Sequence, residues 1–139
     1  MVNNMTEFTE KDAQETLQKG YKKANIILND KSKMDEFLER LEKKLKLIPL
    51  AGTTLAMIPT LVQMVKSYTK KEYTNIPISS IIAIISALLY WLAPIDAIPD
   101  TIPGVGYLDD VTVINFCLKS INKDLKKYKE WQEENKIQN

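Results

Sequence analysis

The chain of 139 residues has the length of one domain, and its 45% of hydrophobic residues can form a sizeable core. A net charge of +1 gives no concentrated basic field, so we expect no nucleic-acid partner. The absence of histidine removes the usual zinc ligand and the usual general base, and Cys117, the one cysteine, excludes an internal disulfide.

Two charged amphipathic helices are predicted at the start of the chain. The first runs from about residue 10 to residue 29, with Thr9 as its N-cap and Asp12 at the capping-box position. Gly20 weakens its middle by roughly 1 kcal/mol relative to alanine, so this helix is expected to need docking. The second begins at Ser32, and its predicted buried stripe is Met34, Phe37, Leu38, Leu41, Leu45 and Ile48.

The sequence loses its charges after this pair of helices. Residues 48–65 and residues 76–95 contain no charged side chain, and the polar, basic segment 66–75 joins the two runs. Pro59 must kink or interrupt any helix in the first run. The second run is apolar on nearly every face, which is typical of the centre of a bundle or of a membrane span. It predicts a central helix over about residues 76–93.

These two runs leave three arrangements open. They form a hairpin that crosses a bilayer twice, they associate with a membrane peripherally or reversibly, or they belong to a fully soluble bundle. The polar and acidic N-terminus, residues 1–10, predicts that there is no cleavable signal peptide. The expected location is therefore the cytoplasmic membrane or the cytoplasm.

A last helix is predicted over about residues 108–133. Its apolar positions repeat at helical spacing, and they are Val111, Ile114, Leu118, Ile121, Leu125 and Tyr128. No β-strand is convincing, so we predict an all-α fold with five helices, in which a loop rich in Pro, Asp and Gly joins the central helix to the last one. The chain is expected to form a single domain over 1–139, with a charged helical pair at 9–46 and an apolar hairpin plus last helix at 48–139.

The loop from Tyr90 to Asp110 contains four carboxylates and three prolines. The structural interpretation is that Pro94, Pro99 and Pro103 set its path while the aspartates cap turns and start the last helix. The alternative is a site for a hard cation, Mg²⁺, Mn²⁺ or Ca²⁺, because these ions prefer carboxylate oxygens. The candidate ligands are Asp96, Asp100, Asp109 and Asp110.

This loop resembles the signature of the YkvA-like family of bacterial proteins, a domain of unknown function. The matching residues are Tyr90, Pro94, Asp96, Ile98, Pro99, Asp100, Ile102, Pro103, Gly106, Tyr107, Asp109 and Asp110. The resemblance covers about residues 78–118 and differs at Ala93, where a serine often precedes the proline. It implies a small helical domain, commonly associated with the membrane and without established catalytic activity.

Three functional hypotheses follow from the sequence. The first is a non-enzymatic helical protein that associates with the membrane, with the motif loop as the joint between its last two helices. The second is a soluble protein that binds a protein partner, as an immunity protein, antitoxin or adaptor does. The third is a carboxylate-bound divalent-metal protein, with a metal-dependent hydrolase as its enzymatic form; otherwise no cofactor is expected. Cys117 lies in an apolar stretch, which is typical of a buried thiol rather than of a nucleophile.

Overall fold

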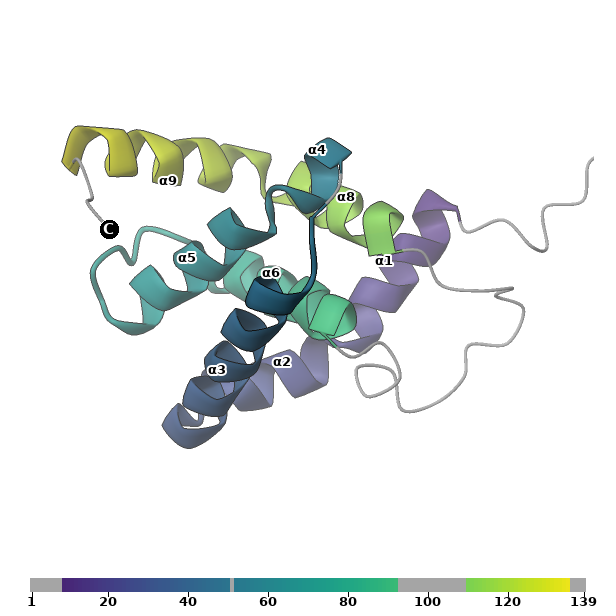
Figure 1. Cartoon of the computed structure of the whole chain (residues 1–139), viewed down its shortest axis with the longest axis horizontal. Coiled ribbons are helices and arrows are strands. Elements are labelled where there is room, and N and C mark those ends of the chain that lie inside the picture. Colours follow the sequence, from purple (N-terminus) through teal and green to yellow (C-terminus); the bar gives the residue numbers. More distant parts are fainter. Residues whose placement is uncertain (1–8, 51, 93–109, 136–139) are drawn as a thin grey trace, which may run out of the picture.

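The computed structural model describes residues 9–50, 52–92 and 110–135 (Figure 1). Every regular element in these ranges is a helix, so the all-α prediction is confirmed for this part of the chain. The elements are α1 (Glu10–Lys19), α2 (Tyr21–Leu28), α3 (Lys31–Leu47), α4 (Gly52–Leu55), α5 (Ile58–Thr69), α6 (Ile78–Leu92), α8 (Asp110–Ser120) and α9 (Asn122–Asn135).

Helix α6 lies at the centre of the bundle, which confirms the predicted central helix. It packs against α1, α2, α3, α5 and α8, which come from both ends of the sequence (Figure 1). Its buried side chains point in all directions around the helix axis because neighbours cover nearly every face. They are Ile81, Ala83, Ile84, Ile85, Ser86, Ala87, Leu88, Leu89, Tyr90 and Trp91.

None of the described helices is both long enough and apolar enough to cross a bilayer. The 15 residues of α6 extend over about 22 Å, against about 30 Å for the hydrocarbon layer of a membrane. In this structure the apolar faces of α6 contact other helices of the same chain. The apolar run at residues 76–95 therefore supplies the core of the bundle over the part that is described.

The described residues contain more helices than the five that the sequence predicts. The predicted first helix is divided at Gly20 into α1 and α2, and the predicted last helix is divided at Ile121 into α8 and α9. At Gly20 the reason is a close approach of α6, because a Cβ atom there would collide with the Ser86 hydroxyl. The same hydroxyl donates a hydrogen bond to the Leu17 carbonyl at 2.6 Å.

The capping residues explain where the first helices begin. Thr9 and Asp12 form the predicted capping box, with hydrogen bonds of 3.1 Å and 3.0 Å between side chains and backbone N–H groups. Helix α3 begins at Lys31 rather than at Ser32, because its N-cap is Asp30, which accepts the Lys33 N–H at 3.0 Å.

The first uncharged run is interrupted as predicted. Pro59 lies in the first turn of α5, where the missing N–H has no helical partner to lose. A turn at residues 56–57 separates this helix from the short α4.

Polar and aromatic contacts fix the position of α9. The hydroxyls of Ser67 on α5 and Tyr128 on α9 are 2.9 Å apart in the interior, and Ser80 on α6 donates to Asp124 at 2.6 Å. The rings of Tyr73, Tyr128 and Trp131 form a cluster with centroids 5.0–5.7 Å apart. The last helix is therefore held by both aromatic packing and hydrogen bonds, and Tyr128 takes part in both.

Candidate functional site

The structure places only the two ends of the predicted motif loop. Tyr90 is buried in α6, with 2% of its surface exposed, and Asp110 is the first residue of α8. The other predicted site residues lie outside the described residues; they are Pro94, Asp96, Pro99, Asp100, Pro103, Gly106, Tyr107 and Asp109. Three of the four candidate metal ligands are in that group, so the cation site stays a prediction.

Lys44 of α3 holds the end of α6 from which the motif loop continues. Its ammonium group donates a hydrogen bond to the Trp91 carbonyl and lies 4.5 Å from the centroid of the Trp91 ring. A cation at this point also faces the negative end of the helix dipole. Sequence reasoning gave Lys44 no role at this site, because no local pattern relates it to a residue 47 positions away.

Helix α8, on the other side of the motif loop, is anchored through its interior face. The Cys117 thiol is buried and donates to the Ala83 carbonyl of α6 at 3.7 Å. Burial raises the pKa of this thiol to about 12, so the nucleophilic thiolate is scarce near neutral pH. These contacts support the interpretation of Cys117 as a structural residue.

Apolar side chains are exposed where α3 ends. Leu47 has 78% of its surface exposed and Ile48 has 44%, and Pro49 beside them is also exposed. Lys43 and Lys46, on the last turn and a half of α3, are exposed as well. We call these five residues, Lys43, Lys46, Leu47, Ile48 and Pro49, the connector surface.

Two residues of the predicted buried stripes are in fact exposed. Ile48 is the C-cap of α3 and has an extended backbone, so it leaves the helical register that would have placed it on the interior face. Val111, in the first turn of α8, has 44% of its surface exposed, whereas Val113 and Ile114 are buried. The rest of each predicted stripe is buried or half-buried, so the two exceptions lie at the described ends of α3 and α8.

The described part of the chain contains no group of three or more acidic or cysteine side chains placed to hold a metal ion. Its strongest shift of a titratable group is the raised pKa of Cys117, and burial also raises the pKa of Tyr21, Tyr73 and Tyr128. All four groups therefore stay protonated near neutral pH.

Comparison with known proteins gives two matches. A family model described as "Protein of unknown function (DUF1232)" matches residues 80–116, which include most of α6, the motif loop and the first half of α8. A relative from Bacillus subtilis (strain 168), named "Uncharacterized membrane protein YkvA", is 32% identical over 75 residues. That alignment covers 54% of this chain and 71% of the relative. No solved structure matches significantly.

Proposed function

The chain belongs to the YkvA-like DUF1232 family, and on that premise we propose that it is a non-enzymatic helical protein that binds the membrane surface peripherally. The printed name of the relative describes a membrane protein. A bundle whose most apolar helix is covered by its own chain can reach a membrane through residues on its outside. The connector surface is the region that we assign to this contact.

The observation that carries the proposal is the exposure of Leu47 and Ile48 next to lysines. An exposed leucine or isoleucine inserts its side chain among lipid acyl chains, and each buried methylene contributes about 0.8 kcal/mol. Lys43 and Lys46, exposed beside them, are attracted to anionic headgroups, which contributes about 1 kcal/mol per basic residue close to the surface. The two contributions reinforce each other because Lys43 and Lys46 lie at the end of α3, directly before the exposed Leu47 and Ile48.

The charge beside the apolar residues favours a lipid surface over a protein partner. The centres of protein interfaces are depleted in lysine, whereas membrane-bound amphipathic segments place lysines beside apolar residues. Binding of a protein partner by the same surface is the rival hypothesis, and it predicts binding that does not depend on lipid charge.

Sedimentation with lipid vesicles tests the proposal. The protein is mixed with vesicles of phosphatidylcholine alone or with added phosphatidylglycerol, and the bound fraction is measured in each pellet. We expect binding to the anionic vesicles that weakens as salt is added, because salt screens the lysines. The double variant Leu47→Ser with Ile48→Ser should bind at least about tenfold more weakly, since it removes the inserted side chains.

A matched control separates this surface from general hydrophobicity. Ile26 on α2 and Ile78 at the start of α6 have 48% and 58% of their surfaces exposed, and both lie outside the connector surface. The variant Ile26→Ser with Ile78→Ser should bind as the unaltered protein does. Equal loss of binding in both variants, or no loss in either, would contradict the assignment of the connector surface.

A further inference from the structure

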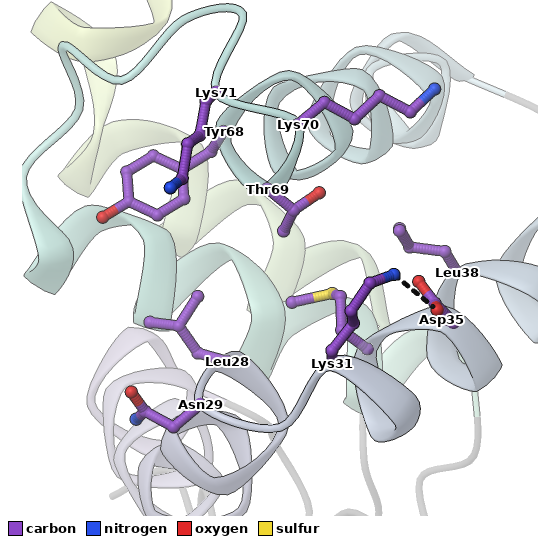
Figure 2. Close-up of a pocket in the computed structure, with 10 residues that line it drawn as sticks. Leu28, Asn29, Lys31, Asp35, Leu38, Tyr68, Thr69, Lys70 and Lys71 are labelled. Atoms are coloured by element: carbon purple, nitrogen blue, oxygen red, sulfur yellow. Dashed lines mark hydrogen bonds and ion pairs between the residues drawn. The ribbon is translucent and has the colours of Figure 1, made fainter.

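A hollow of about 580 Å³ lies between the end of α5 and the turn from α2 to α3 (Figure 2). Its apolar lining comes from Leu28 of α2, from Met34 and Leu38 of α3 and from the ring of Tyr68 on α5. Leu28 and Thr69 face the hollow from opposite walls (Figure 2). The volume is in the range of pockets that bind small molecules, and the lining is continuous across three helices.

The rim of the hollow is positively charged. Lys31, Lys70 and Lys71 line it, and Asp35 is the one acidic residue among its lining residues. That carboxylate is already paired with Lys31 at 3.2 Å (Figure 2). Lys70 and Lys71 have no salt-bridge partner among the described residues. The side chains of Lys70 and Lys71 extend in different directions from the end of α5, and that of Lys71 runs towards Tyr68 (Figure 2). An anion at this part of the rim would therefore meet the uncompensated ammonium group of Lys71.

The backbone of Lys71 is in a conformation that glycine usually supplies. Its φ angle is +63°, in the left-handed region, at the position that directly follows the C-cap of α5. The turn is a Schellman motif, in which the Glu72 N–H donates to the Ser67 carbonyl at 2.9 Å and the Lys71 N–H donates to the Tyr68 carbonyl at 3.1 Å. A lysine at this position is strained, and strained residues cluster at binding sites.

From these observations we propose that the hollow binds a single-chain anionic amphiphile, with its alkyl chain on the apolar lining and a phosphate head at the basic rim beside Lys71. Lysine ammonium groups act as point charges that bind the several oxygens of a phosphate, whereas planar carboxylates favour the fork of arginine, which the rim lacks. A single compact hollow fits a short lipid-like chain better than the row of anchors on a partner helix.

This site is separate from the connector surface. Helix α3 begins at the hollow with Lys31 and ends at Leu47, about 24 Å further along its axis. The proposal therefore does not depend on the proposed membrane contact. Serine substitutions at Leu47 and Ile48 should leave binding at the hollow unchanged.

Titration calorimetry with dodecyl phosphate, below its critical micelle concentration, tests the proposal on the full chain. We expect saturable binding at one site, and at least about tenfold weaker binding of inorganic phosphate, because it leaves the apolar lining uncovered. Dodecyl maltoside, which has the same alkyl chain and a neutral head, should also bind about tenfold more weakly. Equal binding of either compound would overturn the proposal.

The variant Lys71→Gly separates a role in binding from a role in folding. It relieves the left-handed strain, so its melting temperature should rise by about 3 °C, while its affinity for dodecyl phosphate should fall about tenfold. The control is Lys126→Ala on the exposed face of α9, which should bind as the unaltered protein does. A more stable Lys71→Gly with undiminished affinity would overturn the site, as would an equal loss in the control.

Discussion

Gly20 lies where α1 ends and α2 begins, in contact with Ser86 of α6. The variant Gly20→Ala should lower the free energy of unfolding by about 1–2 kcal/mol, although alanine is the better helix former. The added methyl group displaces the Ser86 hydroxyl from the space it occupies and breaks its hydrogen bond to the Leu17 carbonyl. Chemical denaturation followed by circular dichroism measures the change.

A second substitution tests this explanation directly. In the double variant Gly20→Ala with Ser86→Ala the hydroxyl is absent, so the methyl group has room and most of the lost stability should return. Additive losses in the two single variants would show that the clash with Ser86 is not the cause.

The buried thiol of Cys117 should make the free energy of unfolding depend on pH. Because burial raises its pKa to about 12, the folded state holds the neutral thiol while the unfolded chain ionises near pH 8.5. The stability that the neutral thiol contributes is fully present below about pH 8.5 and is lost as the pH rises towards 12. Between pH 8 and pH 10 the protein should therefore lose about 2 kcal/mol more of its free energy of unfolding than the variant Cys117→Ala does.

The measurement is denaturant unfolding of both proteins at each pH value. Alkylation with iodoacetamide provides an independent check, because the folded thiol should react only when the chain opens. A rapid reaction at pH 8 in the absence of denaturant would contradict the burial of this side chain.

At the scale of elements, Tyr128 joins α9 to the rest of the bundle. The Tyr128 hydroxyl meets Ser67 at 2.9 Å inside the bundle, and its ring joins Tyr73 and Trp131. The variant Tyr128→Phe keeps the ring and removes the hydroxyl, so it should cost about 1 kcal/mol by leaving Ser67 without that partner. The half-buried Tyr68 is the control, and Tyr68→Phe should cost less.

Hydrogen exchange locates the effect of this substitution. Amides of α9 should exchange faster in Tyr128→Phe, while those of α6 keep their protection relative to global unfolding. Uniform acceleration along all helices would indicate that α9 is not a separate unit of stability.

The sequence predicted an element well where a short stretch of residues contained the whole pattern. The capping box at Thr9 and Asp12, the interruption near Pro59 and the apolar α6 were each visible in a short window of sequence. The division at Gly20 was not, because it depends on Ser86, 66 positions away in the sequence. The exposure of Ile48 was missed because this residue caps α3 with an extended backbone, and Val111 is exposed although the rest of its stripe is buried or half-buried.

The candidate sites show the same contrast. The family signature around Tyr90 and Asp110 could be read from the chain because it is contiguous. The hollow beside Lys71 could not, because its lining comes from three helices and its strained backbone angle leaves no mark in the sequence. Sequence patterns identify contiguous motifs, and tertiary packing creates the rest.

At the scale of the whole molecule, α6, the most apolar of the described helices, is buried, and we propose that a small basic and apolar surface contacts a membrane. The long uncharged run that resembles a membrane span is used for the core, and α6 is covered by five helices. On this proposal, the protein should fold without detergent and reach a bilayer through side chains on its outside.

One sedimentation measurement on protein purified without detergent tests this claim most directly. The protein is centrifuged alone, with vesicles that contain phosphatidylglycerol, and with the same vesicles in high salt. The account predicts protein in the supernatant, then in the pellet, and then in the supernatant again, because the contact is superficial and charge-dependent. Protein that needs detergent to stay in solution, or that stays with the vesicles in high salt, would contradict it, as would protein that never binds them.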